Sequence, residues 1–147
     1  MSNPSELVLR RDFAMPRAEL WGWLTDTAKT ALWYGPYQRE GGRLFITMIH
    51  EEGQPTVEGT LLGHEDQRML HLRAGTEESD FDYRVELEDI PDGSRVTLRQ
   101  TLHGTPDDPW FEAGWNFYLD CLVHAIQGMP APVFEDYARH LQQDSQG

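Results

Sequence analysis

The sequence predicts an α+β fold in which an antiparallel sheet of about six or seven strands is covered on one face by one long helix near the carboxyl end. From Tyr37 to Gly104, apolar and polar residues alternate with the period of β-strands, and turn-forming residues interrupt them at intervals. Beyond this region the apolar residues return to a helical spacing. These two observations predict consecutive strands followed by a covering helix.

One strand and two short helices are predicted before the alternating region. The strand is indicated by four residues that share one parity: Leu7, Leu9, Arg11 and Phe13. Pro16 follows and suits the first turn of a helix. The apolar side of that helix consists of Leu20, Trp21 and Leu24. Thr25 or Asp26 can cap a second short helix, which ends before Gly35.

The clearest predicted hairpin closes the alternating region. It runs from Phe81 to Ile90, turns at Pro91-Asp92-Gly93 and returns from Ser94 to His103. One face of the pair is apolar apart from Gln100, and the opposite face is charged, so we expect one covered side and one wet side. The strand from Arg43 to His50 has apolar residues on both faces, so its parity leaves the inward face undetermined.

The covering element is predicted as a helix from Pro109 to Gln127, roughly 28 Å long at 1.5 Å per residue. Pro109 suits its first turn, and Gly128 ends it. Its main apolar stripe comprises Phe111, Trp115, Tyr118, Leu119, Leu122 and Ile126.

A last helix is predicted at about Pro132 to Gln142. Its apolar side comprises Val133, Phe134, Tyr137 and Leu141. The long helix carries a second apolar strip, formed by Trp110, Phe117 and Cys121. Either the last helix packs near this strip, or the two apolar strips meet a partner subunit, which would make a homodimer through the C-terminal helix.

Length and composition predict one domain over residues 1–147, with a core at about 6–128 and a C-terminal helical extension at about 130–143. The chain has 25 acidic against 12 basic residues and a formal charge of −13, which disfavours nucleic acids and anionic membrane surfaces as partners. Its one cysteine excludes an internal disulfide. No secretory signal and no run of about 20 apolar residues is visible, so we expect a water-soluble, cytoplasmic protein without membrane attachment.

An ordered set of short segments indicates a family. The segments are Leu9-Arg10-Arg11-Asp12-Phe13-Ala14-Met15-Pro16, Glu19-Leu20-Trp21, Leu32-Trp33-Tyr34-Gly35-Pro36, Gly41-Gly42, Val57-Glu58-Gly59 and Gly114-Trp115. In this order the chain resembles the heat-shock protein 90 ATPase activator homologue-like branch of the START-like (SRPBCC) superfamily. The resemblance implies a helix-grip fold, in which a curved sheet wraps around the long C-terminal helix and a cavity lies between that helix and the concave face of the sheet. Nothing here resembles the additional amino-terminal domain of the activators.

The residues expected to line such a cavity follow from parity. Inward-facing positions include Leu61, Leu72, Tyr83, Val85, Leu98, Trp115, Tyr118 and Leu122. For any one of them packed core is the usual role, and a cavity is expected somewhere among them. Trp33 and Tyr37 are expected near the mouth. Arg11 and Gln100 also have inward parity and are expected as polar contacts of the ligand. A buried arginine needs a carboxylate, either from the ligand or from the protein.

No catalytic residue, metal site or cofactor is predicted, because the histidines lack metal-ligand spacing and no nucleophile elbow, phosphate loop or dinucleotide fingerprint is present. The predicted function is binding of a small hydrophobic molecule that is lipid-like, aromatic or polyketide-like. Two alternatives stay open. One is a cyclase or dehydratase, which needs an acid or base in the cavity. The other is a co-chaperone-like interaction module with a chaperone as partner.

Overall fold

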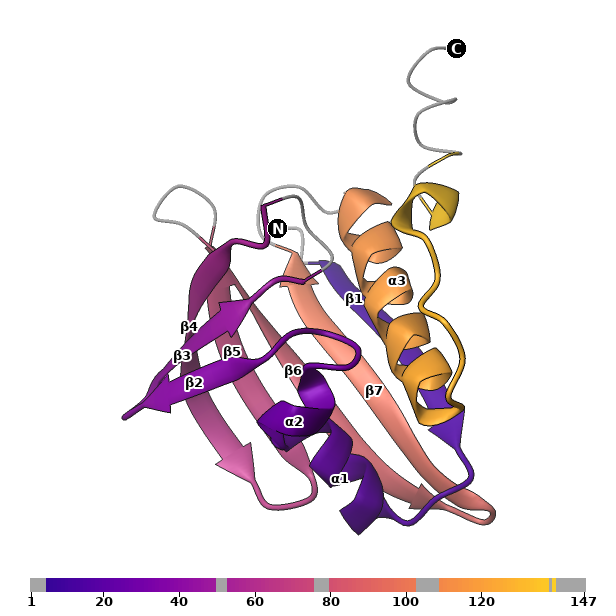
Figure 1. The fold of residues 1–147 in the computed structure, drawn as a ribbon. Coiled ribbons are helices and arrows are strands. Elements are labelled where there is room, and N and C mark those ends of the chain that lie inside the picture. The colour runs from indigo at the N-terminus through magenta and orange to yellow at the C-terminus, as the bar shows by residue number, and fades with distance from the viewer. Residues whose placement is uncertain (1–4, 50–52, 76–79, 103–108, 138, 140–147) are drawn as a thin grey trace.

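The computed structural model describes residues 5–49, 53–75, 80–102, 109–137 and 139 (Figure 1). Its elements follow the predicted order of one strand, two short helices, a run of strands and a long helix. They are β1 (Ser5–Phe13), α1 (Arg17–Thr25), α2 (Thr27–Thr30), β2 (Tyr37–Glu40), β3 (Arg43–Thr47), β4 (Thr56–Glu65), β5 (Met69–Gly75), β6 (Asp80–Ile90), β7 (Gly93–Leu102) and α3 (Pro109–Ile126).

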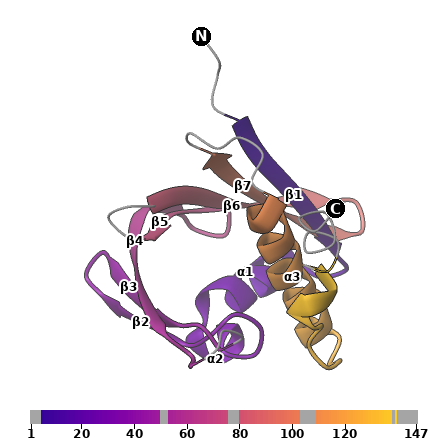
Figure 2. The same cartoon turned by 90° about the horizontal axis from the view of Figure 1, so that it is seen from above.

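The strands form one seven-stranded antiparallel sheet in the order β1-β7-β6-β5-β4-β3-β2. The sheet curls strongly, and α1, α2 and α3 lie on its concave side (Figure 2). A register shift between Leu61 and Gly63 interrupts the β4–β5 ladder, and such irregularities bend a strand. The α+β arrangement, with a curved sheet around a long C-terminal helix, is therefore confirmed.

The hairpin of β6 and β7 matches its prediction apart from the turn and a start one residue earlier, at Asp80. His103, the predicted last residue, lies outside the described residues. Ile90 pairs with Gly93, so the connection is Pro91-Asp92, and Gly93 belongs to the returning strand. A Cβ atom on Gly93 would lie 2.0 Å from the carbonyl oxygen of Phe13, so only glycine lets β1 end this close to the hairpin. Tyr83 and Leu98 are buried on the inner face, as their parity predicts.

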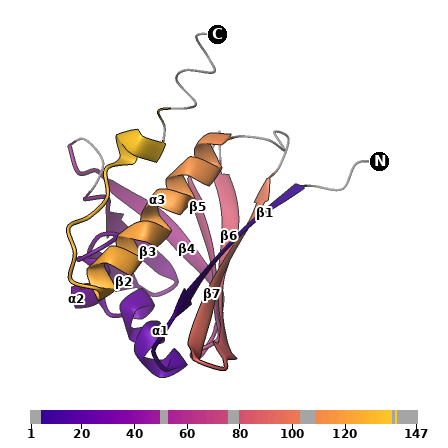
Figure 3. The ribbon, with the colours of Figure 1, turned by 90° about the vertical axis from the view of Figure 1, so that its right-hand side faces the viewer.

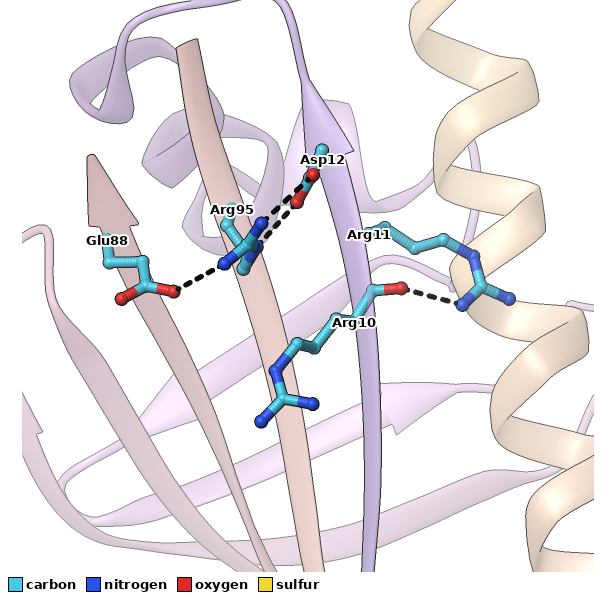
Figure 4. Close-up of polar contacts among 5 residues, drawn as sticks. All are labelled: Arg10, Arg11, Asp12, Glu88 and Arg95. Carbon is cyan, nitrogen blue, oxygen red and sulfur yellow. Dashed lines mark hydrogen bonds and ion pairs between the residues drawn. The ribbon is translucent and has the colours of Figure 1, made fainter. Parts of the chain in front are cut away.

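The outer face of the same strands carries ion pairs. Arg95 on β7 lies between Asp12 on β1, at 2.7 Å, and Glu88 on β6, at 3.4 Å (Figure 4). The hydrogen bond to Arg95 holds the pKa of Asp12 below its ordinary value. These groups are exposed, so we assign them to strand pairing on a solvated face and not to a site.

The structure resolves the face of β3 that parity left undetermined. Leu44 and Ile46 point to the concave side, where they line a cavity. Phe45 has the opposite parity and pairs with Glu58 of β4. The ambiguity arose because Phe45 is apolar and still only partly buried on the outer side.

The segment after α3 turns back along that helix (Figure 3). Residues 134–137 are helical, and the rings of Phe134 and Tyr137 lie 5.5 and 5.7 Å from that of Phe117. The last segment therefore packs on the second apolar strip, as the first of the two alternatives predicts. Pro132 and Val133, which the prediction included, are not helical, whereas residue 139 is helical. Residues 138 and 140–142 of the predicted helix, and the side chain of Trp110 in the strip, lie outside what the structure describes.

One carboxylate joins three segments on the back of α3. Asp120 Oδ1 accepts a hydrogen bond from Arg11 Nε of β1 at 3.0 Å, and Oδ2 accepts one from the Tyr137 hydroxyl at 2.6 Å. Asn116 Oδ1, one turn earlier, accepts from Arg11 Nη2 at 2.9 Å. We call Arg11, Asn116, Asp120 and Tyr137 the clasp. It ties the long helix to the edge of the sheet and to the final segment.

Removing the charge of Asp120 tests how much the clasp contributes to the free energy of unfolding. Asp120→Asn keeps the shape of the side chain but leaves Arg11 without its carboxylate, and both groups are only about a quarter exposed. We expect a loss of about 1–2 kcal/mol in the free energy of unfolding, less than for a fully buried pair. Urea denaturation measures it, with Asp136→Asn as the matched control, because Asp136 pairs with Arg139 on an exposed surface. Equal losses in both variants would contradict a role for the clasp.

Cys121 predicts an alkaline loss of stability. Its side chain is 1% exposed, and burial, followed by the nearby charge of Asp120, raises the thiol pKa from 9.0 to about 12. The folded state thus holds the thiol proton more tightly than the unfolded state. The stabilisation is complete below pH 9 and falls as pH rises toward 12. Between pH 9 and 10, urea denaturation should show the wild type losing about 1 kcal/mol more than Cys121→Ala. The comparison with the variant is needed because Tyr83 and Tyr137, whose pKa values are also raised, lose stabilisation in the same range. Equal losses in the two proteins would contradict the assignment.

No helix within the described ranges is both long enough and apolar enough to span a membrane.

Candidate functional site

A cavity of about 380 Å³ lies between α3, the α1–α2 segment and the concave face of the sheet. Every element except β1 contributes to its wall. The lining consists of Trp21, Leu24, Thr25, Thr30, Trp33, Tyr34, Tyr37, Arg39, Leu44, Ile46, Leu61, His64, Asp66, Leu70, Leu72, Tyr83, Val85, Val96, Leu98, Trp115, Tyr118 and Leu119.

Aromatic rings from three parts of the chain meet in this wall. Tyr83 of β6 lies 4.8 Å from Trp115 of α3, measured between ring centroids, and Tyr34 lies 4.9 Å from Tyr118 of α3. Trp33 and Tyr34 are 5.3 Å apart. The tilted and edge-on arrangements are those that aromatic quadrupoles favour. The rings therefore connect the α2–β2 loop, the sheet and the long helix around one space.

The loop that carries Trp33 and Tyr34 is fixed by hydrogen bonds. Trp33 Nε1 donates to the carbonyl oxygen of Trp23 in α1 at 2.9 Å. The Thr27 hydroxyl bonds to both backbone polar atoms of Tyr37, at 3.0 and 3.1 Å, and the Tyr37 hydroxyl donates to the Thr25 carbonyl. These bonds fix the loop after α2 and the start of β2, and with them the positions of the Trp33 and Tyr37 side chains.

Tyr83 places a polar group on the inner wall. Its side chain is buried, and burial raises its pKa well above the ordinary value, with the neighbouring Tyr34 and a hydrogen bond between the two side chains adding to the effect. The Tyr83 phenol is therefore neutral throughout the physiological pH range. A neutral hydroxyl can both donate and accept a hydrogen bond.

Gln100 does not line the cavity but contacts Trp115, which does. Its side chain is 1% exposed, and its Oε1 accepts a hydrogen bond from Trp115 Nε1. The amide thus satisfies the indole N–H that would otherwise be buried without a partner. This bond fixes the ring of Trp115 over Tyr83, so Gln100 is a positioning residue for the wall.

The structure brings most of the predicted lining residues to one cavity. Those that line it are Trp33, Tyr37, Leu61, Leu72, Tyr83, Val85, Leu98, Trp115 and Tyr118. Leu122 lies outside the lining, fully buried in the core. Gln100 lies behind Trp115.

Arg11 also lies away from the lining. It pairs with Val96 in the β1–β7 register, whereas Gln100 pairs with Leu7, so the strands are adjacent but the two polar side chains are not. Arg11 turns toward α3, where Asp120 supplies its carboxylate. Parity indicated an inward direction without indicating which part of α3 would lie above each position.

Three ionisable lining residues were not predicted as site residues. Arg39 lies on β2, His64 on β4 and Asp66 in the β4–β5 connection, and all are exposed. The polar run from His64 to Arg68 indicates a turn, and nothing in its sequence reveals the register shift between Leu61 and Gly63 that precedes it in β4. The lining residues Leu44 and Ile46 were missed because parity could not orient β3.

The described residues hold no group of three histidine, cysteine or acidic side chains that could bind a metal ion. Two described histidines have other neighbours. His71 is 3.8 Å from Asp82 on the outer side of the sheet, and His124 Nδ1 lies 2.9 Å from the carbonyl oxygen of Pro130.

The fold matches solved structures over most of its length. CalU16 from Micromonospora echinospora has a TM-score of 0.70 and 23% identity, with 82% of this chain and 75% of CalU16 covered. A protein from Bordetella parapertussis has a TM-score of 0.74 and 22% identity, covering 99% of this chain and 86% of its own. DynU16, from the dynemicin biosynthetic locus, has a TM-score of 0.74 and 17% identity, with 90% of this chain and 51% of DynU16 covered.

These identities establish the fold alone, and no curated protein matches the sequence. The family is established by sequence. The sequence model of the family described as "Activator of Hsp90 ATPase homolog 1-like protein" matches residues 14–127, which span α1 to the end of α3. The chain is therefore a member of the Activator of Hsp90 ATPase homolog 1-like family, within the START-like (SRPBCC) superfamily.

Proposed function

We propose that this protein binds a small hydrophobic molecule in the cavity between α3 and the concave face of the sheet. The observation that carries the proposal is the cavity itself, whose volume of about 380 Å³ is lined mainly by aliphatic and aromatic side chains. Small-molecule sites are typically 300–1,000 Å³, mostly apolar, with a few placed polar groups. A packed core would instead leave few voids larger than a water molecule.

The direct test is native mass spectrometry of the protein purified from its own host, followed by denaturing release of anything bound. We expect a stoichiometric small molecule whose affinity derives from the apolar area it removes from water. An apo mass, together with no thermal shift against a panel of hydrophobic compounds, would contradict the proposal.

A matched pair of substitutions tests the location. Leu61→Trp places a large ring in the cavity, because Leu61 belongs to the lining. Leu62→Trp adds the same ring at the next residue, which is exposed. We expect Leu61→Trp to lower ligand affinity at least tenfold, and Leu62→Trp to change it less than twofold, since a blocked site loses most of its apolar contact. Circular dichroism checks that both variants are folded. Equal affinities for the two variants would contradict this site.

An enzymatic role is a second candidate, favoured by His64 and Asp66 in the lining. A cyclase or dehydratase needs an acid or base in reach of the bound substrate. Turnover of the ligand identified by mass spectrometry, lost in His64→Gln or Asp66→Asn, would support this role. Release of unchanged ligand after incubation would contradict it.

A co-chaperone role is a third candidate, favoured by the family match. Apolar side chains are exposed on the segment after α3, including Met129, Val133 and Phe134. Exposed apolar residues of this kind can contact a protein partner. The role predicts a change in the ATP hydrolysis rate of the host's heat-shock protein 90 on addition of this protein, and an unchanged rate would contradict it.

A further inference from the structure

We infer that the ligand of the cavity carries an aromatic ring system, an inference that rests on the proposed binding function and adds the chemical class of the ligand. An alkyl chain or a saturated ring of the same carbon number would bind more weakly. Two features of the cavity wall support this preference. They are the kind of aromatic side chain that the wall contains and the contacts that hold these side chains in place.

The aromatic side chains of the wall are tryptophans and tyrosines. Among the side chains that the structure describes, seven of nine tryptophans and tyrosines line the cavity, whereas none of four phenylalanines does. Two of those phenylalanines, Phe13 and Phe117, are instead buried in the core. Tryptophan and tyrosine are the aromatic residues that predominate where a protein contacts another molecule. The aromatic composition of the wall is therefore that of a recognition surface and not of apolar packing alone.

The seven rings come from five parts of the chain. They are Trp21 of α1, Trp33 and Tyr34 of the loop after α2, Tyr37 of β2, Tyr83 of β6, and Trp115 and Tyr118 of α3. The helices lie on the concave side of the sheet, so their rings and those of the sheet belong to different sides of one space (Figure 2). A molecule in the cavity thus meets aromatic side chains both on the sheet and on the helices.

Rings of this kind distinguish between ligands of similar apolar area. An aromatic ring has a negative face and a positive edge, and an edge-to-face or offset contact between two rings is worth roughly 2- to 12-fold in affinity beyond the buried area. A saturated ring or an alkyl chain gains from buried area alone, which is non-directional. The aliphatic lining residues, such as Leu72, Val85 and Leu98, accept both kinds of ligand and do not discriminate between them.

Contacts within the protein fix the positions of these rings. Trp33 Nε1 donates a hydrogen bond to the carbonyl oxygen of Trp23, and Trp115 Nε1 donates one to Gln100 Oε1. Tyr83 packs against Trp115 with 4.8 Å between the ring centroids. Because the wall is already ordered, binding costs it little conformational entropy. A rigid ring system also loses few rotatable bonds on binding, whereas an alkyl chain loses many, so both partners favour the aromatic ligand.

Three primary alcohols with eleven carbons each separate aromatic recognition from apolar burial: 2-naphthylmethanol, decahydro-2-naphthylmethanol and 1-undecanol. The two saturated alcohols are more hydrophobic, so buried area alone would make them bind more tightly. We expect calorimetry to show 2-naphthylmethanol binding at least threefold tighter than either of them. A smaller preference, or the reverse order, would overturn the inference while leaving the binding function intact. No binding of any of the three would contradict the proposed function itself.

Two leucine substitutions on α1 test the rings themselves. Trp21→Leu removes a ring of the lining and keeps an apolar side chain. Trp23→Leu is the matched control, because the Trp23 ring lies outside the lining, 5.5 Å from the ammonium group of Lys29. We expect Trp21→Leu to lower the ratio of affinities for the naphthyl over the decahydronaphthyl alcohol at least twofold, and Trp23→Leu to keep the wild-type ratio.

Tyr118→Leu removes a lining ring on α3 and should lower the same ratio. Circular dichroism checks that all three variants are folded, and a ratio of two affinities in one variant is insensitive to a shared loss of binding-competent protein. A wild-type ratio in both Trp21→Leu and Tyr118→Leu, or an equal fall in Trp23→Leu, would overturn the inference.

Discussion

Gly35→Ala is expected to destabilise the protein by roughly 3 kcal/mol or more, because a methyl group there meets the backbone of β3. A Cβ atom on Gly35 would lie 1.8 Å from the carbonyl oxygen of Thr47, and the φ angle of Gly35 is 153°. The contact is with backbone, so no side-chain rotation relieves it. The loop after α2 would have to move away from β3.

The same loop forms part of the cavity, so the effect extends to binding. Trp33 and Tyr34 immediately precede Gly35 and contribute two of the rings of the wall. Any Gly35→Ala protein that remains folded should bind hydrophobic probes more weakly. Gly42→Ala is the matched control, since an added Cβ there has no neighbour within 4 Å. Urea denaturation measures both variants. If the losses in free energy of unfolding for Gly35→Ala and Gly42→Ala lay within 1 kcal/mol of each other, the loop could move away from β3 at little cost, which would contradict this prediction.

Sequence periodicity predicted the fold well because each element carries its own signal. The alternation in β6 and β7 predicted which side chains face the core, and Tyr83 and Leu98 are buried as expected. The spacing in α3 predicted a helix from Pro109 to Gln127, and the helix begins at Pro109 and ends one residue earlier, at Ile126. Proline and glycine at the helix ends supplied the boundaries.

Parity along the sequence predicted a site residue only where the face of its strand or helix alone decides whether the side chain lines the cavity. Parity assigns a side chain to one face, but sheet curvature and the rotation of α3 determine what lies opposite. Arg11 has inward parity and reaches Asp120, whereas Gln100 supports Trp115. His64 joins the lining because the register shift between Leu61 and Gly63 changes the parity of β4, so that Leu61 pairs with Leu72 and His64 with Leu70. Simple alternation along β4 does not reveal such a shift.

Leu122→Ala is expected to lower the free energy of unfolding by about 2–5 kcal/mol. Leu122 is fully buried in the core cluster that joins α3 to the sheet, so its truncation removes apolar burial and leaves a void. Leu32→Ala makes the same change where the side chain is 62% exposed, and we expect a change within about 0.5 kcal/mol. Urea denaturation of both variants gives the comparison. Similar losses would contradict the placement of Leu122 in the core.

The same helix allows stability and binding to be separated. Leu119, almost one turn earlier, is also buried but lines the cavity, whereas Leu122 does not. Under conditions where both variants stay folded, Leu119→Ala should weaken binding of a hydrophobic probe, because it removes apolar contact with the ligand. Leu122→Ala should leave the affinity within about twofold of the wild type, since this substitution lowers the free energy of unfolding without removing a contact with the ligand. Equal weakening in both would mean that the ligand contacts α3 beyond the described cavity, and that core and site cannot be distinguished along this helix.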